Sequence, residues 1–188
     1  MAGFLRITGG AWVRKRFRVP EEADQKLVRP ASDRVREAVF SALGSRIAQA
    51  RILDLFSGSG AYVFESLSRG AKEAVLLEKS SKTHRCIQSN LEHLRCEPQC
   101  RLILGDSMDW VVQERLSGLY DIVFVDPPYG LKLPTDYWPK LSRLLSEDAL
   151  VVFRCRSQRE FETPSGYEVI REKTYGGTWV SFLRWESN

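Results

Sequence analysis

The stretch RILDLFSGSG, residues 51–60, decides the fold. Its first half is a short apolar run typical of a buried strand, and the acid Asp54 stands near the end of that run. The loop that follows contains Gly58 and Gly60, and glycines let a backbone approach a ligand closely. A segment with helical character comes next and is ended by Gly70. This strand, loop and helix predict one unit of a parallel α/β sheet.

The same alternation continues along the chain. Near-continuous apolar runs predict six more strands, over 73–79, 101–106, 121–130, 149–155, 167–173 and 178–185. Helical spacing predicts helices over about 32–47, 80–94, 109–117 and 135–145, the first capped by Ser32 or Asp33. The sequence therefore predicts an α/β fold with a doubly wound, mostly parallel seven-stranded sheet. The glycine pair at 176–177 predicts an antiparallel hairpin at the C-terminal end.

The N-terminal end has a different pattern. The runs FLRIT and WVRKRFRV flank Gly9 and Gly10, which predicts a small β-hairpin with a glycine turn. Residues 20–31 are polar and contain two prolines, so we expect a loop there. We expect a hairpin-and-loop extension over 1–30 and a main domain over 31–188.

Positive charge is concentrated in this extension. Residues 1–36 carry nine basic and four acidic side chains, a net charge of +5, whereas the remaining 152 residues carry −1. Strand alternation would place one tryptophan and three arginines on a single cationic face. A polyanion such as RNA would explain the pattern, and a merely solvated charged surface is the alternative. The candidate RNA-binding residues are Arg6, Trp12, Arg14, Arg16 and Arg18.

Composition narrows the classes of protein further. The 188 residues suit one domain, and 43% hydrophobic with 28% charged residues argue against a disordered chain. No apolar run approaches the roughly 20 residues of a membrane span, and the N-terminus lacks the apolar core of a signal peptide. Four cysteines and two histidines show no metal-ligand spacing, which argues against a zinc site. We expect a cytoplasmic protein with reduced thiols and no metal.

Acids end three successive predicted strands: Asp54, Glu78 and Asp106. In a doubly wound sheet, ligands bind at the carboxyl ends of the strands, near the point where strand order reverses. A nicotinamide cofactor fits poorly, because Val63 breaks the G-x-G-x-x-G pattern and Asp54 would repel a pyrophosphate. S-adenosylmethionine fits better, because it offers an ammonium, a sulfonium, a ribose for Glu78 and an adenine amine for Asp106. The alternative is that Glu78 and Asp106 only cap helices.

A second constellation, Asp126-Pro127-Pro128-Tyr129, follows the apolar run DIVFV. The two prolines fix the backbone and remove two N–H donors, so the Pro127 carbonyl and the Asp126 carboxylate become acceptors at one point. Such a pair would grip the hydrogens of a planar conjugated amine and stabilise charge as its nitrogen attacks a methyl group. The Tyr129 ring would stack on a base extruded from its neighbours. The alternative is an ordinary strand that ends in an Asp-Pro turn.

These motifs together resemble a known family. DLFSGSG, the acid of LLEK, GD at 105–106 and DPPY resemble class I methyltransferases that modify exocyclic amines. RITGG…RKRFRVP, RPASDRVREAVFSALG and SLSRGAKEAVLLEKS narrow the resemblance to the bacterial 16S ribosomal RNA guanine-N2 methyltransferases, the family of ribosomal RNA small subunit methyltransferase D. The resemblance covers essentially the whole chain and implies the Rossmann-like fold of class I S-adenosylmethionine-dependent enzymes.

The resemblance implies methyl transfer from S-adenosylmethionine to the N2 amine of one guanine in 16S rRNA, with S-adenosylhomocysteine as product. The partner would be 16S rRNA within an assembling or assembled small ribosomal subunit, and the enzyme would act as a monomer away from membranes. The implied catalytic residues are Asp126, Pro127 and Tyr129. The implied cofactor-binding residues are Asp54, Phe56, Gly58, Gly60, Glu78 and Asp106.

Two points of detail accompany the resemblance. It implies that the helix start at 32–36 closes over the cofactor. Val63 stands where the family usually has a glycine that allows close helix–strand packing, so a small shift of this helix is expected. Two other functions stay open: an amino-methyltransferase acting on DNA adenine, DNA cytosine or a protein glutamine, and a non-catalytic RNA-binding protein.

Overall fold

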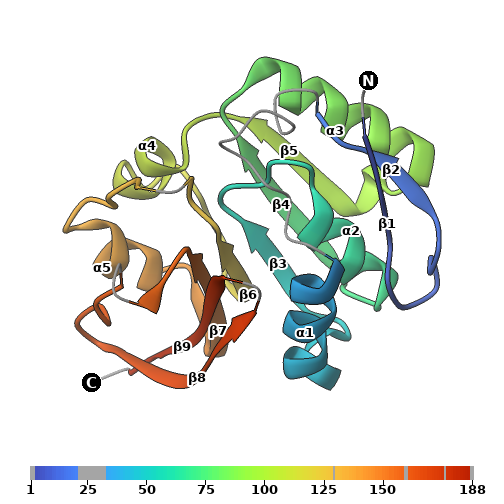
Figure 1. Ribbon diagram of the computed structural model, residues 1–188. Coiled ribbons are helices and arrows are strands. Elements are labelled where there is room, and N and C mark those ends of the chain that lie inside the picture. Colours follow the sequence, from blue (N-terminus) through green and yellow to red (C-terminus); the bar gives the residue numbers. More distant parts are fainter. Residues whose placement is uncertain (1–2, 21–32, 129, 159–160, 176, 187–188) are drawn as a thin grey trace.

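The computed structural model describes residues 3–20, 33–128, 130–158, 161–175 and 177–186. Within them, a seven-stranded sheet lies between two layers of helices, and a two-stranded hairpin packs at one side (Figure 1). The sheet strands are β3 (Arg51–Asp54), β4 (Glu73–Glu78), β5 (Cys100–Leu104), β6 (Tyr120–Val125), β7 (Leu145–Cys155), β8 (Tyr167–Tyr175) and β9 (Thr178–Trp185). The helices are α1 (Asp33–Leu43), α2 (Ala61–Ser68), α3 (Ser81–Leu94), α4 (Ser107–Val112) and α5 (Tyr137–Ser142), with short 3-10 turns η2 (Gly44–Ile47) and η3 (Glu97–Gln99).

The strand order is β5-β4-β3-β6-β7-β9-β8, which confirms the doubly wound, mostly parallel sheet. From β3 the chain builds outward through β4 and β5, and then returns to add β6 and β7 on the other side. The order therefore reverses between β3 and β6, where Asp54 pairs with Phe124. The antiparallel C-terminal hairpin of β8 and β9 is also confirmed, and β9 pairs with β7.

Alternating strand residues supply two apolar cores, one on each face of the sheet. Ile52 and Phe124 point toward α1, α2 and α3, whereas Leu53 and Val125 point toward α4 and α5. All four are almost completely buried, because both faces of a parallel sheet are covered by helices. This double cover explains why the strands are apolar at nearly every position.

Several element ends differ from the expected ones. Helix α4 begins at Ser107 because the Asp106 side chain caps it, and the left-handed backbone of Glu114 follows its end. Strand β7 begins at Leu145, where a helix was expected to end, and reaches this length through a register shift against β6. Among the described residues, no helix is long and apolar enough to cross a membrane.

The predicted N-terminal hairpin exists, but its predicted turn is wrong. Strands β1 (Phe4–Arg6) and β2 (Arg16–Arg18) pair antiparallel, and the whole segment 7–15 connects them. Gly10 has a positive φ of 79°, and a Cβ atom on it would collide with the carbonyl of Ser68 in α2. The glycine pair is therefore needed for close approach to a helix, rather than for a two-residue turn.

The predicted cationic strand face is partly wrong for the same reason. Trp12 and Arg14 lie in the connecting segment, and Arg14 has a left-handed φ of 70°. Arg16 and Arg18 do project from the outer face of β2, on either side of the buried Phe17. The predicted loop over 20–31, apart from the buried Pro20, lies outside the described residues, as do Ser32, Tyr129 and Gly176.

Candidate cofactor and substrate site

Asp54 lies at the centre of the sheet, at the end of β3, and its side chain is completely buried. One carboxylate oxygen, Oδ1, accepts a hydrogen bond of 3.3 Å from the Phe56 backbone N–H. The other, Oδ2, is buried and accepts no hydrogen bond from any residue that the structure describes. Buried acceptors in native proteins are nearly always satisfied, so this oxygen suits a donor brought by a ligand.

The loop after β3 is shaped by its glycines. Gly58 and Gly60 both have left-handed backbones, with φ of 50° and 76°, and Gly60 directly precedes α2. A Cβ atom on Gly60 would lie 2.8 Å from the Phe64 ring, so the turn also needs the missing side chain. The Gly58 N–H donates to Glu78 Oε2 at 3.0 Å, which brings the glycine loop against the end of β4.

Glu78 and Asp106 differ in their relation to the following helices. Glu78 accepts hydrogen bonds from the backbone N–H groups of Gly58 and Ser80, while Ser80 itself caps α3. Burial raises the pKa of Glu78, and these two N–H donors partly offset the effect. Asp106 does cap α4, because its Oδ1 accepts from the Met108 N–H at 2.9 Å. Capping occupies Oδ1 of Asp106, and the exposed Lys79 ammonium lies 3.8 Å from Oδ2.

Asp126 follows β6 directly and lies across the switch point from Asp54. Its Oδ1 accepts a hydrogen bond of 2.6 Å from Arg154 Nε, and the two side chains are only 15% and 10% exposed. Burial raises the pKa of Asp126, whereas the Arg154 guanidinium lowers it. Pro127 is buried beside it. The structure thus brings Asp126 and Pro127 to the same edge of the sheet as Asp54, Gly58 and Glu78.

The two buried aspartates both have raised pKa values but differ in their neighbours. Burial, with the nearby Asp126 carboxylate as the second cause, raises the pKa of Asp54 to about 8. Asp126 has an arginine counter-charge, whereas no cation among the described residues lowers the pKa of Asp54. Neighbouring buried carboxylates with raised pKa values are typical of functional sites.

The raised pKa of Asp54 should make the free energy of unfolding fall as pH rises. In the unfolded chain its pKa is about 3.9, so between about pH 4 and pH 8 unfolding releases a proton from this group. The free energy of unfolding should fall by about 1–3 kcal/mol between pH 5.5 and pH 7.5, and Asp54→Asn should remove this part of the slope. Urea unfolding at the two pH values measures it. The exposed Asp148→Asn is the matched control and should keep the wild-type slope.

Sequence reasoning missed two residues of this site, Arg154 and Tyr62. The run ALVVFRC contains one charged residue in an otherwise apolar strand, and such a charge is rarely buried unless it is paired. That feature could have identified Arg154. The Tyr62 ring stacks on Phe124 at 4.6 Å between ring centroids, and no described residue bonds its buried hydroxyl. Nothing in the local sequence marks Tyr62, because its neighbours are ordinary helix residues.

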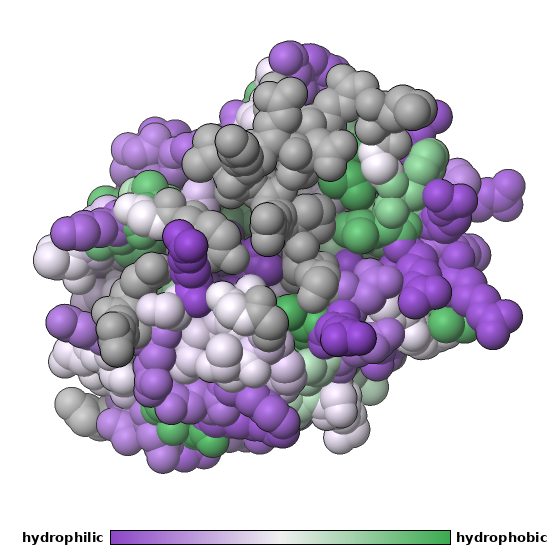
Figure 2. Space-filling view, viewed as in Figure 1, coloured by the Kyte–Doolittle hydropathy of each residue, from purple (hydrophilic) through white to green (hydrophobic). Residues whose placement is uncertain are grey.

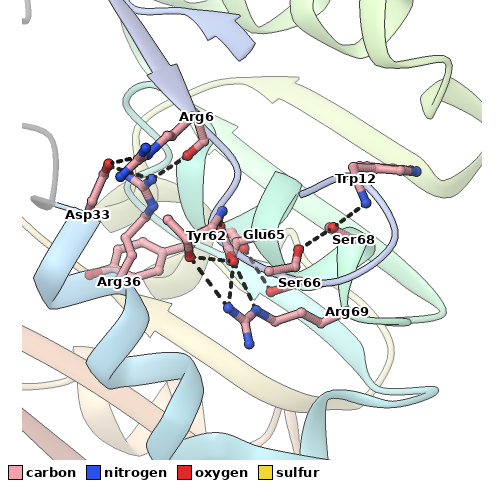
Figure 3. A network of polar contacts seen from close by, with 11 residues as sticks. Arg6, Trp12, Asp33, Arg36, Tyr62, Glu65, Ser66, Ser68 and Arg69 are labelled. Atoms are coloured by element: carbon pink, nitrogen blue, oxygen red, sulfur yellow. Dashed lines mark hydrogen bonds and ion pairs between the residues drawn. The ribbon is translucent and has the colours of Figure 1, made fainter. Parts of the chain in front are cut away.

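The N-terminal hairpin is fastened to α2, the helix that follows the glycine loop (Figure 3). Glu65, 1% exposed, accepts hydrogen bonds from the Thr8 N–H at 2.9 Å and the Thr8 hydroxyl at 2.8 Å. The same carboxylate pairs with Arg69 at 2.8 Å. Ser68 Oγ donates to the Gly9 carbonyl and accepts from the Trp12 N–H. The hairpin and the helix therefore share one buried polar network.

Helix α1 also contacts the hairpin, through its first turn (Figure 3). The fully buried Arg36 donates to the Arg6 carbonyl at 2.7 Å and to Asp33 Oδ1 at 2.9 Å. Arg6 itself pairs with Asp33 Oδ2 at 3.1 Å. The start of this helix was expected to close over the cofactor. In its described part, Asp33 and Arg36 contact the hairpin.

This sheet order, with helices on both faces and acids at the strand ends, is the Rossmann-like fold of the class I methyltransferases. The chain belongs to the family of the ribosomal RNA small subunit methyltransferases D, and the family model described as "Conserved hypothetical protein 95" matches residues 5–184.

Two relatives and one solved structure carry this assignment. Ribosomal RNA small subunit methyltransferase D of Haemophilus influenzae is 32% identical over 93% of this chain and 90% of the relative. The protein of the same name from Escherichia coli K12 is 34% identical over 93% of this chain and 87% of the relative. The solved structure of Escherichia coli yhhF superposes with a TM-score of 0.86 at 31% identity, over 99% of this chain and 100% of that one.

Proposed function

We propose that this protein transfers a methyl group from S-adenosylmethionine to the exocyclic N2 amine of a guanine in 16S rRNA of the small ribosomal subunit. The observation that carries the proposal is the Asp126 carboxylate, held beside Pro127 at the switch point of a methyltransferase fold. Relatives named for ribosomal RNA methylation, which match nearly the whole chain, support the substrate class.

The residues at the strand ends fit S-adenosylmethionine. Asp54 Oδ2 lacks a donor from the described residues and would accept from the ammonium group or face the sulfonium charge. The two left-handed glycines leave the loop backbone open to close approach. Glu78 uses one lone pair on each oxygen for backbone N–H groups, so it retains acceptor capacity for ribose hydroxyls. Phe56 and Asp106 would complete the site around the adenine.

In this reaction the protein would mainly supply hydrogen-bond acceptors to the target amine. S-adenosylmethionine supplies an electrophilic methyl group on a sulfonium sulfur. The guanine nitrogen would form a bond to that carbon as the carbon–sulfur bond breaks and its electron pair stays on the now neutral sulfur. The nitrogen would then give one of its two protons to the Asp126 carboxylate, which would pass it to water. Asp126 and the Pro127 carbonyl would accept hydrogen bonds from the two amine hydrogens and stabilise positive charge on the nitrogen. Tyr129 would stack on the extruded guanine.

Cofactor affinity should depend on Gly58. Gly58→Ala adds a side chain to the loop backbone that we propose approaches the cofactor, and we expect the dissociation constant for S-adenosylmethionine to rise at least about tenfold, or about 1.4 kcal/mol. Isothermal titration calorimetry measures this. Gly44→Ala is the matched control, because Gly44 has a similar φ of 54° in open space beyond α1. Both variants carry the same backbone strain, so equal affinities would contradict the assignment.

The proposal is tested by methylation of small-subunit particles from a strain that lacks its own enzyme of this family. The purified protein and isotope-labelled S-adenosylmethionine should place label in 16S rRNA. Nuclease digestion and mass spectrometry should then identify one N2-methylguanine. Label in DNA or in a protein glutamine instead would favour one of the other amino-methyltransferases. Particle binding without cofactor binding would favour a non-catalytic RNA-binding protein.

A further inference from the structure

Strand register brings Asp126 and Arg154 together. In the parallel pair β6 and β7, Val125 lies opposite Phe153, and the next residues along the two strands are Asp126 and Arg154. Because both strands run in the same direction, these two side chains emerge at the same end of the sheet. The contact between them is therefore fixed by the core of the sheet and does not depend on a surface loop.

The contact uses one side of the carboxylate. Arg154 Nε donates to Asp126 Oδ1 at 2.6 Å, and no hydrogen bond from a described residue reaches Oδ2. Ion pairs between largely buried groups add little to stability, because the cost of desolvating both charges offsets their attraction. Holding Oδ1 fixes the plane of the carboxylate and leaves Oδ2 for a further donor.

The other charged and titratable groups near this pair include a second acid, so Asp126 needs a counter-charge to stay ionised. Asp54 at the end of β3 is a second buried acid close to Asp126, and Glu78 at the end of β4 also interacts electrostatically with Asp54. The Tyr62 hydroxyl, from α2, interacts electrostatically with Asp126 and Arg154, and also with Arg36 from α1. Without Arg154, Asp126 would share this space with another acid and would have no adjacent cation among the described residues.

We propose that Arg154 is a positioning residue, which holds the Asp126 carboxylate charged and in one orientation so that Oδ2 accepts a hydrogen from the target amine. This inference rests on the proposed methyl transfer and adds to it a residue that acts through Asp126. Its electrostatic part has a direct consequence: burial raises the pKa of Asp126, and Arg154 is the main influence that lowers it. Loss of Arg154 should therefore raise the pKa of Asp126 further, so that the carboxylate forms only at higher pH.

The test compares Arg154→Met, Arg154→Lys and the control Arg184→Met. Arg184 on β9 forms an exposed ion pair with Glu168 on β8, so its loss removes an arginine–carboxylate pair away from the site. For each variant, kcat and KM for small-subunit particles are measured from pH 5.5 to pH 9, together with the dissociation constant for S-adenosylmethionine. Titration of the Asp126 carboxyl carbon is followed by ¹³C NMR as a readout that needs no activity.

We expect Arg154→Met to lower kcat at pH 7 by at least about tenfold, within the range for a preorganised electrostatic group, with cofactor affinity unchanged. Its rate should rise at a pH at least about one unit higher than in the wild type, and the Asp126 carbon should titrate with the same displacement. Arg154→Lys keeps the charge but loses the planar guanidinium. Its kcat should therefore rise over the same pH range as in the wild type, but should be several-fold lower at every pH. Arg184→Met should match the wild type.

Unchanged titration of Asp126 and an unchanged pH limb in Arg154→Met would overturn the inference, even if rRNA methylation is confirmed. If Arg154→Met does not fold, Arg154→Lys decides, because a wild-type kcat in that variant would overturn the orienting role. A wild-type protein that labels no RNA would instead overturn the proposed function, while a displaced Asp126 titration would still show the effect of Arg154.

Discussion

Asp126→Ala is expected to lower turnover by about 100-fold or more while S-adenosylmethionine binds as tightly as before. The alanine removes the carboxylate that would accept a hydrogen from the target amine, and one preorganised group of this kind contributes a factor of about 100–1,000. The proposed cofactor site lies at the ends of β3 and β4, so contacts made through Glu78 should remain. Single-turnover methylation of small-subunit particles, with calorimetry of cofactor binding, separates the two effects.

Two further variants make this test sharper. Asp126→Asn keeps one acceptor oxygen but leaves Arg154 without its counter-charge. We therefore expect its turnover to lie between those of the wild type and the alanine variant. Asp148→Ala removes an exposed acid on β7, far along the strand from Arg154, and should methylate like the wild type. Wild-type turnover in Asp126→Ala would refute the proposed role of the carboxylate.

The parallel sheet and its acidic edge could be predicted because their causes are local. Strands covered on both faces must be apolar at nearly every position, so runs such as RILDLF and DIVFV indicate buried strands by themselves. The carboxyl ends of parallel strands share one edge of the sheet, so acids at those ends meet in space. Asp54 and Glu78 are brought together in this way, with Gly58 between them.

The hairpin turn and the arginine partner could not be predicted because their causes are distant in sequence. Two glycines between strand-like runs look the same whether they form a tight turn or allow another element to approach. Gly10 needs its missing side chain because of Ser68, which belongs to α2. Arg154 pairs with Asp126 only after the register of β6 against β7 is set. Neither contact leaves a pattern within a short window of sequence.

The arginines of the hairpin do not form the single strand face that was predicted. The structure therefore changes which of them are available to a partner. Cross-strand pairing puts Phe4 opposite Arg18 and Arg6 opposite Arg16 on the outer face, and the Arg16 guanidinium lies 4.7 Å from the Phe4 ring centroid. Figure 2 shows hydrophilic side chains gathered along the edge of the molecule where β1 and β2 lie. Arg6 is held by Asp33. By contrast, Arg14, Arg16 and Arg18 are exposed and form no ion pair with the described residues.

Removing these last three charges together should weaken binding to small-subunit particles by about 100-fold at 0.1 M salt. Each arginine that contacts a phosphate adds about 0.7–0.9 to the slope of log affinity against log salt, so the slope should also fall by about two units. Filter binding across a salt series measures both quantities. Folding and S-adenosylmethionine affinity should stay unchanged, because the contacts to Glu65 and Ser68 that fasten the hairpin come from Thr8, Gly9 and Trp12.

The control is the triple variant Arg143→Ala/Arg171→Ala/Arg184→Ala, which removes the same charge from exposed positions on the α5, β8 and β9 side of the molecule. If net charge alone governs attraction to RNA, both triple variants should lose affinity and slope equally. If the hairpin holds phosphates, only the variant of Arg14, Arg16 and Arg18 should lose slope, because counterions are released only where contacts form. Equal binding by that variant and the wild type at every salt concentration would make the hairpin a structural element and place the RNA surface elsewhere.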